Sequence, residues 1–193
     1  YRRQSQPEWM KLAKTVPIYG IWDDHDFTTN DGWGGPDIEK PKWKRKVWEI
    51  FKENYDNPYY GGGEKQPGCW FDFRIGDVHF VLIDGRYYRE SPRSKENPSM
   101  LGPAQLKWLK QTLKQPATFK VLCTNVPMTP KVKPGSKDTW DGFAAERQKI
   151  FQYIADQKIP GLVILSADRH RSDAYKIDTG IKGMYPLYEC QSS

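Results

Sequence analysis

The chain has few cysteines and no long apolar run. Its 193 residues include three cysteines, which are widely spaced and form no CxxC pair: Cys69, Cys123 and Cys190. Such a set predicts neither a disulfide framework nor a zinc ribbon, and we expect three small buried residues instead. The mean hydropathy is -0.81, and no stretch approaches the length of a transmembrane helix. We therefore expect no membrane span, and no signal segment opens the chain.

Positive charge is in excess but is spread along the chain. Lysine and arginine number 30 against 24 aspartates and glutamates, so the formal net charge is +6. This excess favours phosphoesters, nucleic acid or acidic surfaces as partners. The densest basic run, Lys40–Lys46, contains Trp43 and has two interpretations: a nucleic-acid contact, or the solvated face of a helix. We expect the helix, with its apolar side inward and its lysines outward.

Polar clusters follow apolar runs at three places in the chain. Asp23–Asp26 follows the run over 16–22, Asn125 follows 119–124, and Asp168 and His170 follow 161–166. Buried strands deliver the residues at their ends to the edge of a sheet, where open α/β folds bind ligands. Crowded like charges raise one another's pKa unless a cation, a hydrogen-bond network or a reaction stabilises them. Carboxylate, amide and imidazole together suit calcium, manganese, iron or zinc, so we predict a metal site.

Helix and strand patterns alternate along the chain without an internal repeat. We expect helices over 7–14, 42–55, 103–114 and 143–157, and strands over 16–22, 70–75, 78–83, 119–124, 161–166, 173–177 and 185–190. Gly76-Asp77 between two of these strands is a hairpin signal. The alternation predicts an α/β fold that contains one core or part of a larger one.

Several motifs occur in an order that resembles a known family. They are WDDHD at 22–26, a strand ending in Asp84-Gly85-Arg86, LGPAQLKWL at 101–109, Asn125-Val126-Pro127, DTWDGF at 138–143 and SADRH at 166–170. This series resembles the PhoD-like alkaline phosphatases, a branch of the calcineurin-like metallophosphoesterases. The resemblance implies an αββα sandwich of two mixed sheets flanked by helices. Residues 1–193 then form a single partial catalytic domain, because the family's early Asp and Gly-Asp segment have no counterpart before Trp22.

The resemblance also implies a function. It implies a metal-dependent phosphoesterase that hydrolyses phosphate monoesters, diesters or both by metal-activated water. Two or more metal ions, iron, calcium or both, would be held by Asp24, Asn125, Asp168 and His170, while His25 would act on the phosphoryl oxygen or leaving group. A phosphoester or phosphodiester is the expected partner, with nucleic acid as a further candidate substrate. The implied location is secreted, periplasmic or otherwise extracellular.

Structural interpretations of these residues stay open. His25 can be hydrogen-bonded within its loop, and Asn125 can cap the end of its strand. Asp168 can belong to a turn that pairs with the neighbouring arginines. Asp31, in a glycine-rich loop, can supply an oxygen ligand, but we interpret it as part of an Asx turn.

Two further alternatives concern Arg86 and the protein as a whole. Arg86 follows a strand end, so it is a candidate catalytic residue that binds phosphate bidentately, or it pairs structurally with Asp84. The alternative function is a non-catalytic polyanion-binding or interaction subunit that keeps the fold.

Overall fold

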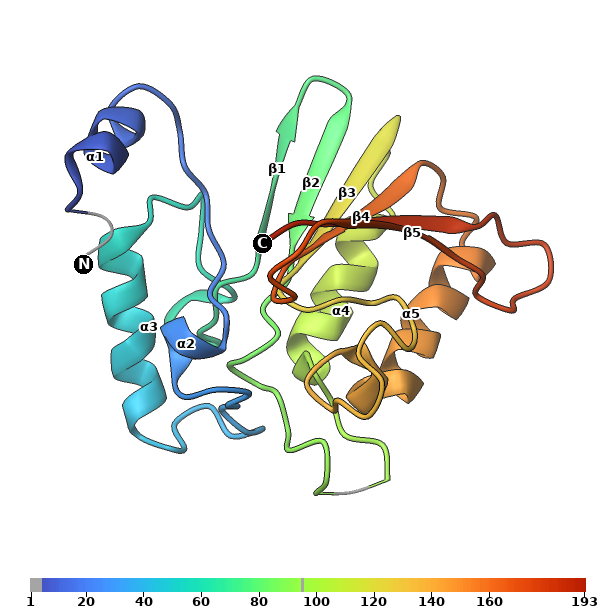
Figure 1. The fold of residues 1–193 in the computed structure, drawn as a ribbon, viewed down its shortest axis with the longest axis horizontal. Coiled ribbons are helices and arrows are strands. Elements are labelled where there is room, and N and C mark those ends of the chain that lie inside the picture. The colour runs from blue at the N-terminus through green and yellow to red at the C-terminus, as the bar shows by residue number, and fades with distance from the viewer. Residues whose placement is uncertain (1–4, 95) are drawn as a thin grey trace.

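The computed structural model describes residues 5–94 and 96–193, which form helices around a central sheet (Figure 1). The elements in chain order are α1 (Pro7–Ala13), α2 (Asp24–Phe27), α3 (Trp43–Asn54), η1 (Gly63–Lys65), β1 (Phe71–Ile75), β2 (Val78–Leu82), α4 (Gly102–Leu113), β3 (Phe119–Thr124), η2 (Trp140–Phe143), α5 (Ala144–Asp156), β4 (Leu162–Ser166), β5 (Asp173–Ile177) and β6 (Leu187–Gln191). The expected mixed α/β architecture is confirmed.

The sheet has six strands in the order β1-β2-β3-β4-β6-β5. The inner strands β2, β3, β4 and β6 run parallel, and the edge strands β1 and β5 are antiparallel to their neighbours. The predicted hairpin at Gly76-Asp77 joins β1 to β2. The second sheet of the expected sandwich is not found within 5–94 and 96–193. Because the carboxyl ends of parallel strands share one edge, the residues after β2, β3 and β4 emerge close together.

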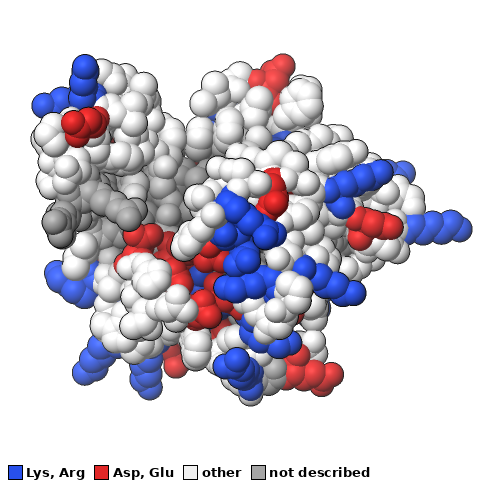
Figure 2. Space-filling model, in the orientation of Figure 1, with Lys and Arg blue, Asp and Glu red and all other residues white. Residues whose placement is uncertain are grey.

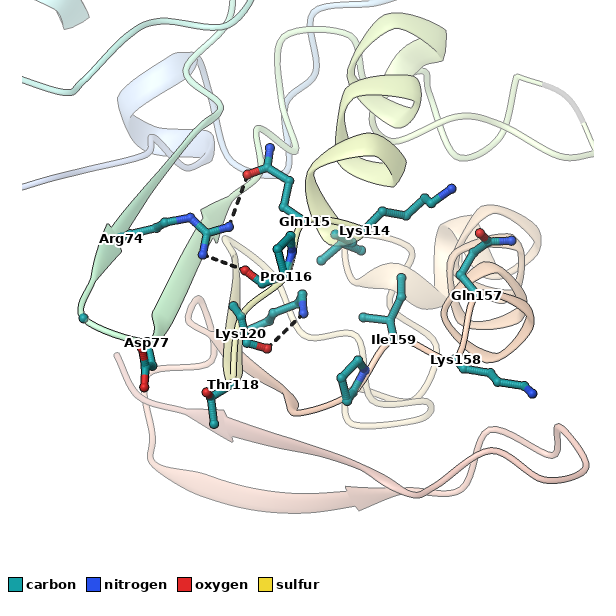
Figure 3. Close-up of a pocket in the computed structure, with 14 residues that line it drawn as sticks. Arg74, Asp77, Lys114, Gln115, Pro116, Thr118, Lys120, Gln157, Lys158 and Ile159 are labelled. Atoms are coloured by element: carbon teal, nitrogen blue, oxygen red, sulfur yellow. Dashed lines mark hydrogen bonds between the residues drawn. The ribbon is translucent and has the colours of Figure 1, made fainter.

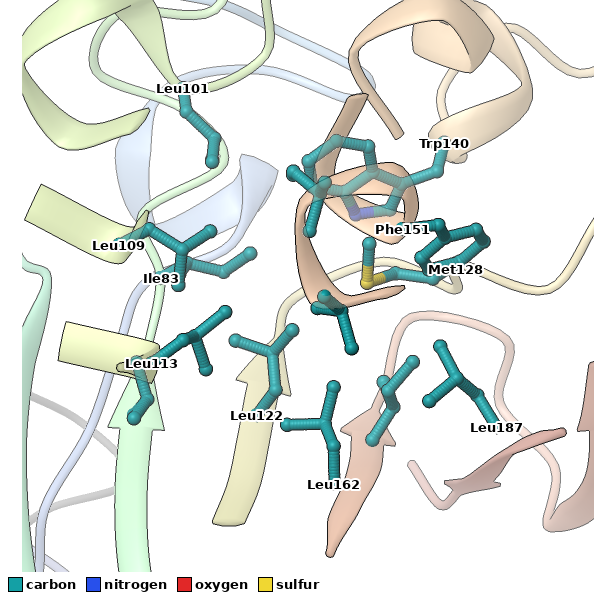
Figure 4. Close-up of a cluster of buried hydrophobic side chains, with 14 of the residues drawn as sticks. Ile83, Leu101, Leu109, Leu113, Leu122, Met128, Trp140, Phe151, Leu162 and Leu187 are labelled. Atoms are coloured by element: carbon teal, nitrogen blue, oxygen red, sulfur yellow. The ribbon is translucent and has the colours of Figure 1, made fainter. Parts of the chain in front are cut away.

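Helices α4 and α5 supply the apolar side chains that cover one face of this sheet (Figure 4). Leu109 and Leu113 of α4 and Ile150 and Ile154 of α5 are buried, each pair at the i, i+4 spacing that aligns side chains on one helix face. They belong to one core cluster with strand residues such as Leu122, Ile164 and Leu187. Alternation along β3, β4 and β6 sends other apolar side chains to the opposite face, where Phe119, Leu165 and Tyr188 are exposed.

An aromatic cluster holds the N-terminal third of the chain together. Trp22, Phe27, Trp48, Phe51 and Tyr87 are buried in it. The helix predicted from the basic run is confirmed as α3, which buries Trp48 and Phe51. Two expectations for this helix are wrong: Trp43 and Ile50 of its apolar side are exposed, and one of its lysines is buried.

Lys44 of α3 points inward rather than outward. The side chain is fully buried, and its Nζ donates to the carbonyl oxygens of Gly34, Gly35 and Tyr87 and lies over the Tyr87 ring. Burial lowers the pKa of Lys44 to about 8. Backbone carbonyls that need donors therefore explain this inward lysine, which the charge pattern alone placed in solvent.

The strand predicted over 16–22 is not formed. The backbone of Gly20 pairs with the side chain of Asn57 instead of a neighbouring strand: Gly20 N donates to Asn57 Oδ1 at 3.0 Å, and Asn57 Nδ2 donates to Gly20 O at 2.8 Å. Val16 and Tyr19 are exposed. The apolar pattern resembles a buried strand, but a loop anchored by Asn57 and Trp22 satisfies these backbone groups.

Two smaller expectations can be compared with the structure. No helix among the described residues is long and apolar enough to cross a membrane. Of the three cysteines, Cys69 is buried, Cys123 is half-buried and Cys190 is exposed. The expectation of three buried cysteines is confirmed only for Cys69. Cys123 and Cys190 lie on the less buried face of β3 and β6, whose burial patterns alternate.

Asp84, just after β2, ties the loop before α2 to the sheet. Its fully buried carboxylate accepts hydrogen bonds from Trp22 Nε1 at 2.7 Å, from the backbone N–H groups of Arg86 and Tyr87, and from Cys69 N. The hydrogen bond from Trp22 to Asp84 fixes residues 23–26 relative to the sheet, since Trp22 immediately precedes them.

Replacing Trp22 with phenylalanine is expected to destabilise the protein by about 1.5–3 kcal/mol, because a buried carboxylate loses a donor. Urea unfolding of the purified protein measures the change. Trp43→Phe is the matched control: Trp43 is exposed on α3, so that change should stay within about 0.5 kcal/mol. Equal effects of both substitutions would contradict the anchoring role of Trp22.

Candidate active site

Residues after three parallel strands meet the start of α2. Asn125 follows β3, and its Nδ2 donates to Asp23 Oδ1 at 2.8 Å. Arg86 follows β2, and its Nε donates to the same oxygen at 2.7 Å. The first two strand-end groups therefore converge on Asp23, whereas the sequence singled out its neighbour Asp24.

Asp24 faces a different set of partners. It is buried, and its Oδ1 accepts from the backbone of His25 while its Oδ2 accepts from the backbone of Asp31, each at 2.8 Å. Single carboxylate oxygens of Asp24, Asp31 and Asp138 all lie within 4.8 Å of one another. This group is compatible with a shared cation, which needs several oxygen donors at short range.

Two members of this carboxylate group were not predicted as ligands. Asp31 has a φ of +56°, as an Asx turn allows, and it still presents its carboxylate to Asp24 and Asp138. Asp138 is the first residue of the DTWDGF motif, and its place in that motif is the sequence feature that could have indicated it as a ligand. Neither residue follows a strand, so the strand-end pattern did not indicate Asp138, and Asp31 was weighed as an oxygen ligand but interpreted as part of an Asx turn.

Arg86 links Asp23, which is bonded to the strand-end residue Asn125, to Asp138 of the carboxylate group. The guanidinium is fully buried and reaches Asp23 through Nε, Asp138 through Nη1 at 2.8 Å and Nη2 at 3.2 Å, and Gly32 O through Nη1. Its Nη2 also pairs with Asp23. Its side chain does not pair with Asp84, which contacts only its backbone N–H. With its donors engaged by protein oxygens, Arg86 positions carboxylates rather than offering a free fork to phosphate.

Burial and these charges set the ionisation of the carboxylates. Burial raises the pKa of Asp23 above its ordinary value, although Arg86 and Asn125 oppose the shift. Burial also disfavours the charged form of Asp138, but Arg89 and Arg86 hold its pKa below the ordinary value. Burial and then the charges of Asp23 and Asp138 raise the pKa of Asp168 to about 6. Negative charge is therefore crowded at the end of β4.

Two buried oxygens near this region have no hydrogen-bond donor among the described residues. Asn125 Oδ1 and Asp168 Oδ2 have no hydrogen-bond partner within the described part of the chain. An unpaired buried acceptor costs free energy, and a cation removes that cost. The alternative in which Asp168 pairs with Arg171 loses support, because Arg171 pairs with Asp173. The residues present thus fit a metal ion bound by oxygen ligands.

The two candidate histidines lie at the surface. His25, in α2, and His170, after β4, are both exposed. The backbone N–H of His170 donates to Ser193 Oγ at 2.7 Å. Within 5–94 and 96–193, the group of carboxylates that lie within 4.8 Å of one another includes neither histidine. Their roles therefore stay predictions.

A separate cavity of about 570 Å³ lies at the opposite end of the strands (Figure 3). Gly76, Thr118 and Pro160, which precede β2, β3 and β4, line it. Arg74 donates to Pro116 O and Gln115 Oε1 there, which fixes the segment between α4 and β3. The predicted site residues follow the carboxyl ends of the strands, so this cavity is distinct from the candidate site.

Comparisons with known proteins identify the family and agree with the fold. The PhoD-like phosphatase family model matches residues 1–190. Alkaline phosphatase D of Bacillus subtilis (strain 168) is 29% identical over 120 residues, covering 52% of this chain and 21% of that protein. A solved structure of PhoD superposes with a TM-score of 0.79 at 19% identity, covering 100% of this chain and 42% of that one. The chain thus spans less than half the length of these relatives. It belongs to the PhoD-like phosphatase family.

Proposed function

We propose that the protein hydrolyses phosphoesters and depends on bound metal ions. The observation that carries this proposal is the set of oxygen groups at the carboxyl ends of β3 and β4, where Asn125 Oδ1 and Asp168 Oδ2 lack donors among the described residues. The charges of Asp23 and Asp138 act on Asp168, and the side chain of Asn125 is hydrogen-bonded to Asp23. Membership of a phosphatase family supports the reaction class.

The residues fall into two groups by their contacts. We propose Asn125 and Asp168 with Asp23 as one set of ligands, and Asp24 with Asp31 and Asp138 as another. His170 remains a proposed ligand from the sequence. Metal ions bound there would neutralise charge on phosphoryl oxygens and activate water. Iron, calcium or both are the proposed ions.

The protein's own groups have distinct tasks in this scheme. Arg86 fixes Asp23 and Asp138 relative to each other. His25, exposed at the start of α2, is proposed to donate a proton to the departing alkoxide, since a neutral alcohol leaves more easily. Monoesters and diesters are both proposed substrates, and an extracellular or periplasmic location follows from the family resemblance.

Hydrolysis assays with and without chelator test the proposal. The full-length protein should hydrolyse p-nitrophenyl phosphate or its bis ester at neutral to alkaline pH. Exhaustive chelation and dialysis should abolish turnover, and added metal should restore it. The proposed ligands are oxygen acceptors, which cannot supply the positive charge of the metal ion themselves. Turnover that persists after chelation would reject the metal dependence. No turnover with any added metal would favour the non-catalytic, polyanion-binding alternative.

A further inference from the structure

A cavity of about 300 Å³ adjoins the carboxylate group, and its lining includes four basic residues and two acidic ones. Asp31 and Asp138 form one wall, and Trp33 contributes an aromatic side chain. The basic residues are Arg89, Arg93, Lys133 and Lys137. Figure 2 shows acidic side chains gathered near the middle of this face, directly beside basic ones. The cavity therefore combines access to the candidate site with a positive lining.

Arg89 is the buried element of this lining. It is fully buried, and its guanidinium lies over the Phe143 ring, 4.8 Å from the ring centroid. Its Nη2 pairs with Asp138 Oδ1 at 2.7 Å. Among the described residues, its Nε and Nη1 have no acceptor. Both atoms are closed off from solvent in this conformation. Buried donors without acceptors cost free energy, so an anion that reached them would be stabilised.

The positive charge of the lining comes from its other basic residues. Arg89 and Arg86 share Asp138, and Arg86 also pairs with Asp23, so these four charges balance. The rest of the lining has Arg93, Lys133 and Lys137 against Asp31. Burial, with the charge of Arg86, lowers the pKa of Arg89 to about 10, which keeps it protonated at neutral pH. The cavity wall therefore keeps a net positive charge.

Lys133 connects the cavity to the strand-end site. It lines the cavity together with Asp31 and Asp138, which belong to the carboxylate group. A group bound between Lys133 and Arg89 would thus lie beside the proposed reaction centre, on the side of the 131–137 loop.

We propose that this cavity binds a second phosphate group of the substrate, next to the ester that is hydrolysed. The inference rests on the proposed function. A guanidinium with free N–H groups binds phosphate oxygens bidentately, and the lysine adds a second charge for a dianion. Because Asp138 belongs both to the carboxylate group and to the cavity lining, a substrate that reaches both sites needs only a short linker between its two phosphates.

Calorimetric binding and hydrolysis of a matched pair of compounds test this inference in the full-length protein. The pair is propane-1,3-diol bisphosphate and propane-1,3-diol monophosphate. We expect the protein to bind the bisphosphate more tightly, and Lys133→Gln to reduce that preference about 10-fold, since a charge-assisted contact is lost. Arg89→Gln should act in the same direction. Lys131→Gln is the control, because Lys131 is an exposed neighbour outside the cavity lining.

The outcomes separate this inference from the proposed function. Equal binding of the two compounds by the unmodified protein would overturn the second-phosphate subsite. An equal loss of preference in Lys131→Gln and Lys133→Gln would also overturn it, because it would indicate a diffuse surface charge. A preference for the bisphosphate without hydrolysis of either compound would retain the subsite and reject the phosphoesterase proposal.

Discussion

Replacing Arg86 with methionine is expected to remove most of the turnover and to destabilise the protein by about 3–5 kcal/mol. The guanidinium is fully buried and holds Asp23 and Asp138 in one network. Methionine fills much of the volume but leaves Asp23 with no guanidinium and Asp138 with Arg89 alone. Carboxylates that lose their counter-charge in a buried site become harder to ionise, and the proposed ligands then shift away from each other.

Urea unfolding and hydrolysis of p-nitrophenyl phosphate measure the two parts of this expectation. Arg74→Met is the matched control, because Arg74 is an exposed arginine beside the cavity at the opposite end of the strands. It should keep its turnover. Arg86→Lys should restore little, since an ammonium cannot reach two carboxylates with the geometry of the planar fork. Full turnover in Arg86→Met would show that the Arg86 network does not position the site.

Replacing Asp168 with asparagine is expected to change the melting temperature in opposite directions with and without metal. In the metal-loaded protein the variant should hold less metal per chain and melt lower, because an ion bound only by the native state stabilises it by mass action. In the metal-free protein the variant should melt higher near neutral pH. Burial and neighbouring carboxylates raise the pKa of Asp168 from 3.8 to about 6, so its ionised form is disfavoured in the folded state.

The pH dependence follows from the sign of that shift. A carboxyl group with a raised folded-state pKa binds its proton more tightly in the native protein, so stability falls as the pH rises from about 4 through about 6. Thermal melts of the metal-free protein across this window should show the fall, and the fall should be smaller in Asp168→Asn, which keeps only the contributions of other carboxyl groups such as Asp23. Elemental analysis provides the metal content. Equal metal content in both proteins would overturn the ligand assignment of Asp168.

His25→Ala serves as the contrasting variant. It should lower turnover about 100-fold to 10,000-fold if His25 protonates the leaving group, while metal content and melting temperature stay unchanged. A loss of bound metal in His25→Ala would assign the histidine to the ligand set instead.

The sequence by itself determined the elements that position the site. Periodic apolar residues predicted α3, α4 and α5, and continuous apolar runs predicted β2, β3 and β4, because local side-chain spacing decides which face can be buried. Asn125 and Asp168 were found by their place after such runs. Parallel strands place their carboxyl ends at one edge, so this part of the site follows from chain order and strand direction.

The tertiary structure alone decided which charged groups meet. Asp31 and Asp138 lie on loops far apart in the chain, yet their carboxylates lie close together. The side chain of Arg86 pairs with Asp23 and Asp138 and not with the nearby carboxylate of Asp84. The run at 16–22 became a loop because Asn57 satisfies the backbone of Gly20. Lys44 turned inward for the same kind of reason, to supply a donor to buried carbonyls. Such pairings depend on which polar groups are left unsatisfied after the chain has folded, and no local pattern encodes that.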